Sequence, residues 1–316
     1  MIYKELIKTI SKSRTFVISS HVNQDGDCIG SQLAMYWYLT SLGKTGIIYN
    51  TDKLPQKFGF LENSDKVIDE IPDQKFDMLF VLDSSNPTRT GWNECTDYAK
   101  NLIIIDHHRD NSEEGDINIV DHSAAATCEI IYRFFIHNEI DFPDYVAEAL
   151  YTGILTDTGG FQFSNTTSDI LRISADLVDR GAKSTAIYKK IYASYSHAGL
   201  LLRSKIWSTL EYHFDNKLAL MEMSIPLVDE MGADYGDVEG MSEQCLLARG
   251  VEVGLFIKYD ENRTHFSLRS TGNIDVGMVA KNFPGGGGHA FAAGCTVEEP
   301  FEIAKKQVLD IIKKEL

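Results

Sequence analysis

The sequence of 316 residues has little proline and no long apolar segment. No apolar run is long enough to cross a membrane, and the first residues are of mixed polarity, so neither a membrane protein nor a secreted protein is expected. Only seven prolines and a hydrophobic content of 43% argue against a disordered chain. The sequence therefore predicts a folded, cytoplasmic protein of two domains, at roughly 150 residues per domain.

Basic residues are also scarce, because 30 Lys and Arg stand against 46 Asp and Glu and give a net charge of −16. A protein that follows long nucleic acid needs a broad basic surface to release counterions. The composition therefore predicts no long duplex partner, although a local site for small anions or divalent cations is open. The composition is also compatible with a homodimer.

Cysteine pairs of the kind that bind zinc are missing. The five cysteines include no CxxC motif, and their number is odd and their spacing irregular. This pattern predicts free thiols in a reducing compartment, and it argues against a disulfide framework or a zinc knuckle.

Short apolar strands alternate with helices in the first half of the chain, which predicts a mostly parallel, doubly wound α/β sheet. A longer helical pattern at 184–212 is expected to lead to a smaller α+β domain. We predict domains at 1–190 and 214–316, with a helical linker at 191–213. The expected strands are 15–20, 46–50, 77–82, 101–105, 217–224, 251–260 and 263–270, and the expected helices are 31–42, 122–138, 144–156, 169–181 and 300–314.

Acidic residues and histidines directly follow three of the predicted strands. In open α/β sheets ligands bind beyond the carboxyl ends of the strands, so we expect these side chains to meet at one edge. Asp157, at the end of the helix 144–156, could join them. The strand-end residues are His21, Asp25 and Asp27 after 15–20, Asp83 after 77–82, and Asp106, His107 and His108 after 101–105.

Such a group of residues favours a metal centre. Carboxylates gathered closely repel one another unless their pKa values rise or cations lie among them. Oxygen and imidazole ligands without thiolate favour Mn²⁺, with Mg²⁺, Co²⁺ or Zn²⁺ less decisively excluded. Six candidate ligands exceed what one catalytic ion with open positions needs, so we predict two ions about 3.5–4 Å apart. A single Asp after a strand is usually a helix cap, and the prediction therefore depends on the whole set.

Five segments contain distinctive motifs: HVNQDGDCIGS, FVLDSS, IIIDHH, GILTDTGGF and GGGGHAFAAG. The first four resemble the successive motifs of the DHH phosphoesterase superfamily, and the fifth resembles the signature of its DHHA1 domain. The similarity covers essentially the whole chain, and the compact form is most similar to the NrnA-like group. The resemblance implies an enzyme that hydrolyses oligoribonucleotides of a few residues and dephosphorylates 3′-phosphoadenosine 5′-phosphate.

The resemblance also implies a role for each matching residue. Asp83 would bridge two ions and take part in catalysis with Asp106 and His108. Asp106 would orient a ligand imidazole, while His108 would contact the phosphate or protonate the leaving oxygen. The first ion would be held by His21, Asp25 and Asp83, and the second by Asp27, Asp83, His107 and Asp157.

The glycine run 285–288 precedes a histidine near the C-terminus. It lacks the GK[ST] ending of a P-loop, so it is either a flexible linker or a nest of N–H groups for an anion. Arg269, at the end of a predicted strand, could bind a phosphate through two hydrogen bonds. The DHHA1 resemblance implies substrate binding by Arg269, Gly287, Gly288 and His289.

The sequence bears on four alternatives to an NrnA-like enzyme. A compact phosphodiesterase for linear or cyclic dinucleotides, such as pApA or cyclic di-AMP, is the main one, since the sequence does not separate it from an NrnA-like enzyme. The GGGH segment argues against a family II pyrophosphatase, and RecJ-like exonucleases are usually longer. A nucleotide-binding sensor without turnover is expected to lack some ligand residues, and every expected position here is filled.

Overall fold

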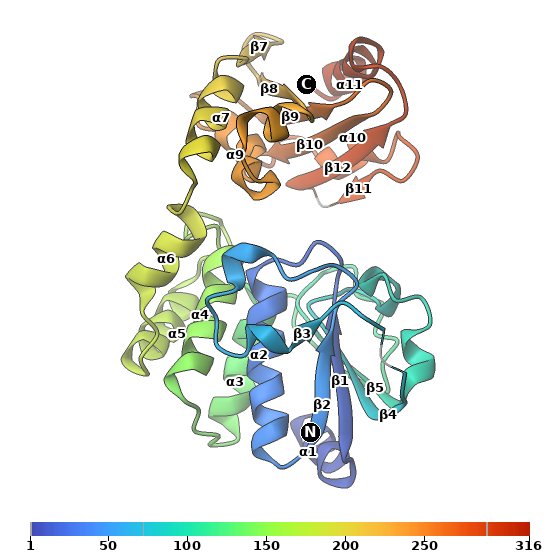
Figure 1. Cartoon of the computed structure of the whole chain (residues 1–316), viewed down its shortest axis with the longest axis vertical. Coiled ribbons are helices and arrows are strands. Elements are labelled where there is room, and N and C mark those ends of the chain that lie inside the picture. Colours follow the sequence, from blue (N-terminus) through green and yellow to red (C-terminus); the bar gives the residue numbers. More distant parts are fainter. Residues whose placement is uncertain (1, 72, 289) are drawn as a thin grey trace. The chain divides into compact units, whose positions relative to one another are not determined.

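Six parallel strands form the sheet of the N-terminal unit (Figure 1). They are β1 (Thr15–Ser20), β2 (Thr45–Tyr49), β3 (Val67–Ile68), β4 (Phe76–Leu82), β5 (Ala99–Asp106) and β6 (Ile117–Val120). The order across the sheet is β3-β2-β1-β4-β5-β6. The four strands predicted in this half are confirmed to within two residues, and the short edge strands β3 and β6 are additional.

Helices cover one face of this sheet, and short 3-10 helices cover the other. On the helical side, buried residues of the sheet and of α1, α2, α3 and α4 form one core cluster. On the other side, Trp92 and Cys95 pack on Val17 and Leu79 near η3 (Pro87–Thr90) and η4 (Cys95–Tyr98). The helices are α1 (Ile2–Lys12), α2 (Gly26–Ser41), α3 (Thr127–His137), α4 (Asp144–Asp157), α5 (Ser168–Asp179) and α6 (Ser184–Tyr192).

Glycines allow α2 and α4 to pack closely. A Cβ atom on Gly30 would lie 2.3 Å from the carbonyl oxygen of Ala149. A Cβ atom on Gly153 would lie 2.7 Å from Oδ1 of Asp27. Any larger residue at either position would separate the two helices, so the glycines keep the start of α2 beside the end of α4.

The structure, a computed structural model, describes residues 2–71, 73–288 and 290–316. They form two compact units, which divide between Ser194 and Tyr195. The helical pattern predicted at 184–212 is not continuous, because the chain leaves α6 at Tyr192 and a new helix, α7 (His197–Trp207), follows. The hydroxyl of Ser196 accepts a hydrogen bond from the N–H of Gly199 and caps α7, which explains the interruption.

The C-terminal unit contains a mixed six-stranded sheet in the order β11-β12-β10-β9-β8-β7. β8 and β9 are parallel, and the other neighbours are antiparallel, including the predicted hairpin of β9 and β10. The strands are β7 (Glu211–His213), β8 (Leu218–Ser224), β9 (Val253–Tyr259), β10 (Thr264–Ser270), β11 (Gly287–Gly288) and β12 (Ala292–Val297).

Helices pack on both faces of this second sheet. α7, α8 (Leu227–Met231) and α9 (Met241–Cys245) share a core with one face of β8 and β9. α10 (Val276–Ala280) and α11 (Phe301–Glu315) share a larger core with the opposite face. Residues 191–213, predicted to link the domains, contain the end of α6, then α7 and β7, and α7 buries Leu202 and Ile206 in the C-terminal unit.

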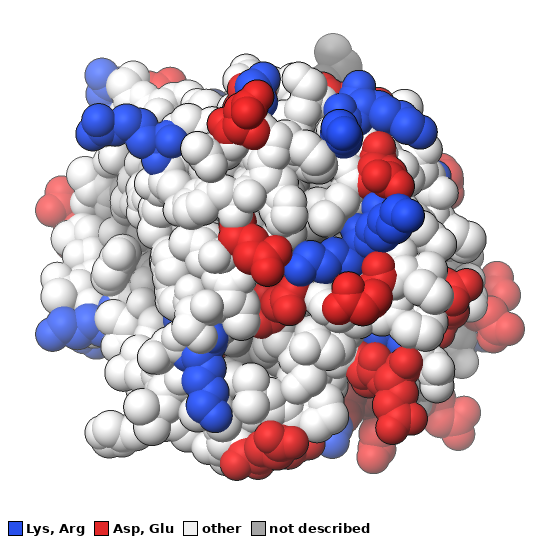
Figure 2. All heavy atoms as spheres, turned by 90° about the horizontal axis from the view of Figure 1, so that it is seen from above, with Lys and Arg blue, Asp and Glu red and all other residues white. Residues whose placement is uncertain are grey.

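The face in Figure 2 is mostly uncharged, with scattered acidic and basic side chains and no broad basic area. This agrees with the charge of −16. Among the described residues, no helix is both long enough and apolar enough to cross a membrane.

Candidate metal centre

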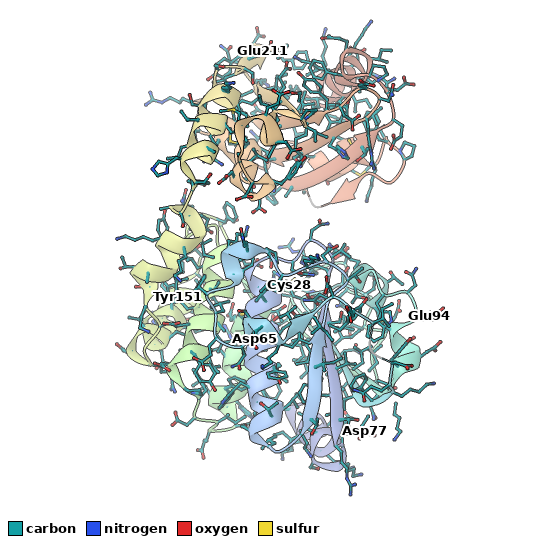
Figure 3. The ribbon with its side chains drawn as sticks, viewed as in Figure 1. Cys28, Asp65, Asp77, Glu94, Tyr151 and Glu211 are labelled. Atoms are coloured by element: carbon teal, nitrogen blue, oxygen red, sulfur yellow. The ribbon has the colours of Figure 1, made fainter. Side chains whose placement is uncertain are left out.

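The strand order creates a topological switch point between β1 and β4. From β1 the order runs to β2 and β3 in one direction and to β4, β5 and β6 in the other. Ligands of doubly wound sheets bind at such a point, beyond the carboxyl ends of the strands. The register aligns the ends of three strands, so the residues His21, Asp83 and Asp106 come together at one edge, as predicted. Cys28 lies at this edge and Asp77 at the opposite one (Figure 3).

Asp25 begins α2. Its Oδ1 accepts hydrogen bonds from the backbone N–H groups of Asp27, at 2.9 Å, and of Cys28, at 3.0 Å. This capping explains why α2 starts at Gly26, several residues before the predicted helix. Asp25 also lies in a group with His21, Cys28 and Asp83, in which one ligand atom of each residue lies within 4.8 Å of the others.

Asp27 is completely buried and connects α2 to α3. Its Oδ2 accepts the backbone N–H of Thr127, and its Oδ1 accepts that of Cys128 at 2.8 Å. The N-cap residue of α3, Ala126, has no side chain to do this, so Asp27 caps the helix from outside. Burial raises the pKa of Asp27 well above its usual value, and the charges of Asp83 and Asp157 raise it further.

Asp83 directly follows β4 and has a left-handed backbone, with φ of 53°. Such a conformation is costly for a residue other than glycine and is often found at functional sites. The hydroxyl of Thr127 donates to Oδ1 at 3.3 Å, and the thiol of Cys28 donates to Oδ2 at 3.2 Å. Nε2 of His107 lies 3.4 Å from Oδ1, and Nε2 of His21 lies 3.6 Å from Oδ2.

These neighbours determine the charge of Asp83. Burial alone would raise its pKa, but the hydrogen bond from His107 and the charges of His21, His107 and His108 hold the pKa well below its usual range. Asp83 is therefore an ionised carboxylate with imidazoles on both of its oxygens.

His107 joins Asp83 to Asp157. Its Nε2 lies 3.1 Å from Oδ2 of Asp157, while Nδ1 faces the carbonyl oxygen of Ala124 at 3.4 Å. Burial lowers the pKa of His107, but the two carboxylates raise it well above its usual value. Burial raises the pKa of Asp157 to about 6, despite its hydrogen bond with His107. Asp27, His107 and Asp157 form another group within 4.8 Å.

Asp106 orients His108, whereas we predicted that it would orient an imidazole that binds metal. Its Oδ1 lies 2.7 Å from Nδ1 of His108, and its Oδ2 accepts from the side-chain amide of Asn111 at 2.7 Å. Burial lowers the pKa of His108, but the hydrogen bond with Asp106 and the charge of Asp83 outweigh it and raise the pKa. The orientation of His107 depends on Ala124 instead.

The donor atoms fit divalent cations. Three carboxylates with little exposure, from Asp27, Asp83 and Asp157, lie close together, and within the described part of the chain none of them forms an ion pair with Lys or Arg. Carboxylate and imidazole donors suit Mn²⁺ and neighbouring ions. The structure adds one further donor to the predicted set, the thiol of Cys28. Its contact with Asp83 depends on the packing of α2 against β4.

Adding Mn²⁺ to the metal-free protein should raise the melting temperature of the N-terminal unit by roughly 5–10 °C. A cation present at one hundred times its Kd stabilises the folded state by about 2.7 kcal/mol. Each kcal/mol shifts the Tm of a unit of this size by about 2–4 °C. Calorimetry of EDTA-treated protein with and without Mn²⁺ would measure the shift. The exposed-site variant Asp110→Asn should retain it and Asp157→Asn should lose most of it, while an unchanged Tm in the original chain would contradict the site.

The glycine run of the C-terminal unit is part of the sheet. Gly287 and Gly288 form β11 and pair with Gly294 and Ala293 of β12, which excludes the flexible-linker interpretation. A Cβ atom on Gly288 would lie 2.5 Å from the carbonyl oxygen of Ala292, so only glycine fits at this position. His289, the remaining residue of the predicted set, lies outside the described residues.

Arg269 lies on β10, opposite Ala292 of β12. Its Nε donates to Oε1 of Glu243 on α9 at 2.6 Å, and its Nη1 donates to the carbonyl oxygen of Leu268 at 2.9 Å. The ion pair with Glu243 fixes the guanidinium while the side chain stays about one third exposed. No motif in the sequence points to Glu243.

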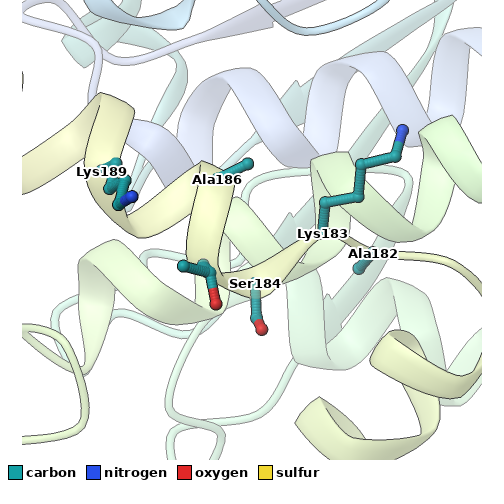
Figure 4. A pocket seen from close by; sticks show the side chains of 6 residues that line it. Ala182, Lys183, Ser184, Ala186 and Lys189 are labelled. Carbon is teal, nitrogen blue, oxygen red and sulfur yellow. The ribbon is translucent and has the colours of Figure 1, made fainter.

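A surface pocket of about 410 Å³ lies elsewhere, at the start of α6 (Figure 4). None of the predicted site residues lines it. Its lining residues are Ala182, Lys183, Ser184, Thr185, Ala186 and Lys189.

The strand order, the DHH sequence at the end of β5 and the separate mixed-sheet unit define a DHH-type phosphoesterase. The sequence matches the DHH family, N-terminal domain, over residues 15–154 and the DHHA1 domain over residues 217–316. The chain belongs to this family of hydrolases.

Several known proteins are similar along their whole length. The bifunctional oligoribonuclease and PAP phosphatase NrnA of Thermus thermophilus is 32% identical, over 95% of this chain and 89% of that protein. NrnA of Bacillus subtilis is 26% identical, over 93% and 92%. The crystal structure of an exopolyphosphatase-related protein from Bacteroides fragilis has a TM-score of 0.91 at 26% identity and covers 99% of this chain and 94% of its own. Exonuclease RecJ bound to manganese shares the fold, with a TM-score of 0.52 at 12% identity over 99% of this chain and 93% of its own.

Proposed function

We propose that this phosphoesterase hydrolyses short oligoribonucleotides to mononucleotides and 3′-phosphoadenosine 5′-phosphate to AMP, with two divalent ions, Mn²⁺ first among them. The observation that carries the proposal is the position of Asp83, whose two oxygens face imidazoles from separate strands. The NrnA relatives, at 26% and 32% identity, support the choice of substrate.

Two ions would be held by residues of the N-terminal unit, and Asp83 would be a ligand of both. Bound ions supply positive charge to the phosphate oxygens and lower the pKa of water. Asp27 can take part although both of its oxygens accept N–H bonds, because each carboxylate oxygen has a second lone pair. The first ion would be held by His21, Asp25 and Asp83, and the second by Asp27, Asp83, His107 and Asp157.

His108 is the proposed general acid. Asp106 holds its Nδ1 at 2.7 Å, so the ring presents Nε2 in a fixed orientation. Although burial lowers the pKa of His108, the hydrogen bond with Asp106 and the charge of Asp83 raise it overall, which favours the protonated imidazole. It can therefore donate a proton to the oxygen of the departing sugar, a contribution that is typically about 10²–10⁴-fold.

The C-terminal unit would bind a second phosphate of the substrate. Arg269, fixed by Glu243, offers the remaining N–H groups of its guanidinium for a charge-assisted hydrogen bond. Gly287 and Gly288 have no side chain that would prevent close approach, and we include His289 from the family motif. A substrate with few phosphates needs only such local contacts, which is how a chain with a net charge of −16 can act on RNA.

A panel of substrates with Mn²⁺ tests the proposal. RNAs of two to five nucleotides and 3′-phosphoadenosine 5′-phosphate should have the highest kcat/KM, at least about tenfold above cyclic di-AMP and pyrophosphate, which corresponds to about 1.4 kcal/mol. A preference for pApA or cyclic di-AMP would instead favour a dinucleotide phosphodiesterase. Tight binding of all nucleotides without turnover would contradict an enzyme and favour a sensor.

A further inference from the structure

One face of β10 carries a row of polar and basic side chains. Alternate residues of the strand are buried among α10 and α11, and the residues between them are partly exposed on the opposite face. Within the described residues, α9 covers this face near Arg269 through Glu243. The partly exposed residues are His265, Ser267 and Arg269.

The neighbouring strands extend the same face. Residues directly opposite each other in an antiparallel pair have side chains on the same side of the sheet. β9 thus places Lys258 beside His265, and β12 places Thr296 on its other side. Next to Ser267, β12 has Gly294. The β9 side of the row therefore has Lys258 at the His265 end, followed by the buried Phe256 and by Gly254. The β12 side has only small residues.

Contacts fix the imidazole of His265 in this row. Its Nδ1 lies 2.9 Å from Oγ1 of Thr296. When the hydroxyl donates to Nδ1, Nε2 carries the ring proton and is a hydrogen-bond donor. Burial lowers the pKa of His265, and the nearby charges of Arg263 and Lys258 lower it further, which places the lysine charge close to the ring.

The spacing of the row suits a chain of phosphates. Alternate residues of an antiparallel strand are about 7 Å apart, so Arg269 and His265 are separated by roughly 14 Å. Such a distance leaves room for two phosphates of an extended single strand, each on its own side chain. The row ends in acidic surroundings, where Glu298 pairs with Arg263 at 3.1 Å and Asp260 lies nearby. These carboxylates would repel further phosphates.

We propose that Lys258 and His265 form a second phosphate subsite, which binds the phosphodiester of nucleotides beyond the one held at Arg269. This inference rests on the proposed function. 3′-Phosphoadenosine 5′-phosphate has one phosphate to be hydrolysed and one for Arg269, so it does not need the subsite. Each added nucleotide brings one more phosphate, and RNAs of four or five nucleotides gain the contact.

The test compares substrates of different length in the full chain. In the double variant Lys258→Ala/His265→Ala, the KM for a five-nucleotide RNA should rise about tenfold, as expected for a lost charge-assisted hydrogen bond. The KM for the short substrate, 3′-phosphoadenosine 5′-phosphate, should stay within about twofold, because this substrate loses no hydrogen bond in the variant. The slope of log KM against log salt for the RNA should become shallower by about 0.7 per lost phosphate contact. Lys281→Ala, an exposed lysine of the same unit, should change none of these values.

Other outcomes would overturn the subsite. An equal loss for both substrates would show a structural effect of the variant, and an unchanged KM for the RNA would show no contact. Arg269→Ala should weaken the binding of both substrates, and it serves as the comparison for the double variant. Fluorescence anisotropy with a labelled five-nucleotide RNA and no metal measures binding without hydrolysis. It therefore tests the subsite separately from the proposed function. If the original chain fails to hydrolyse any substrate, the proposed function fails, while equal RNA binding by the double variant and the original chain refutes the subsite.

Discussion

Replacing Asp83 with asparagine should lower kcat/KM by about a thousandfold or more at saturating Mn²⁺. If Asp83 bridges two ions as proposed, its carboxylate would contribute to both cation positions, and such charge stabilisation is worth several kcal/mol in the transition state. Each 1.36 kcal/mol corresponds to about tenfold in rate. Initial rates with a dinucleotide RNA and with 3′-phosphoadenosine 5′-phosphate would measure the loss.

Asparagine is the informative replacement because of the backbone at this position. The φ of 53° is one that asparagine adopts more readily than alanine, so Asp83→Asn should fold where Asp83→Ala adds strain. Asp110→Asn, at an exposed position, is the matched control and should keep full activity. Turnover by Asp83→Asn within tenfold of the original chain, with the fold verified by circular dichroism, would contradict the bridging role.

Replacing His108 with alanine should reduce the hydrolysis of RNA by about 10²–10⁴-fold. The loss should be much smaller for a nucleoside p-nitrophenyl phosphate, because p-nitrophenolate departs without receiving a proton. The ratio of the two losses therefore measures proton donation separately from substrate binding. Steady-state kinetics with both substrates would provide it.

Two further variants help to interpret the result for His108. Asp106→Asn should show part of the same substrate-dependent loss, since it weakens the hydrogen bond that orients the ring. His122→Ala, at an exposed histidine, should have no effect. If His108→Ala lost the same factor with both substrates, the imidazole would be a binding group and the assignment as general acid would be wrong.

The strand ends could be predicted because their signal is local. Each apolar strand is a continuous run that stops at an Asp or His, and the rule that ligands gather at the carboxyl edge then brings these residues together. The imidazole that forms a hydrogen bond with Asp106 can also be predicted from a local pattern. Residues two apart in an extended strand share a side, so Asp106 faces His108 and not His107.

Other features depend on tertiary contacts, for which a single sequence has no marker. Cys28 and Thr127 donate to the same carboxylate from two different helices, and neither belongs to an acidic or histidine motif. Glu243 reaches Arg269 from a helix of five residues, which is too short to give a clear pattern. The break between α6 and α7 was missed because Ser196 was assigned to a continuous helix and not to a cap.

The capping of α3 by Asp27 affects how loss of activity in this family should be recognised. A descendant that abandoned turnover and kept only ligand recognition would still need an acceptor at position 27, since otherwise two N–H groups of α3 would be buried without partners. An aspartate at position 27 in a relative is therefore weak evidence that the relative is an active enzyme. Within the described residues, the side chain of Asp157 contacts His107 and caps no helix, so selection for folding alone would not preserve it. If Asp157 holds a metal ion as proposed, substitution at 157 would be the earlier sign that a lineage has ceased to be catalytic.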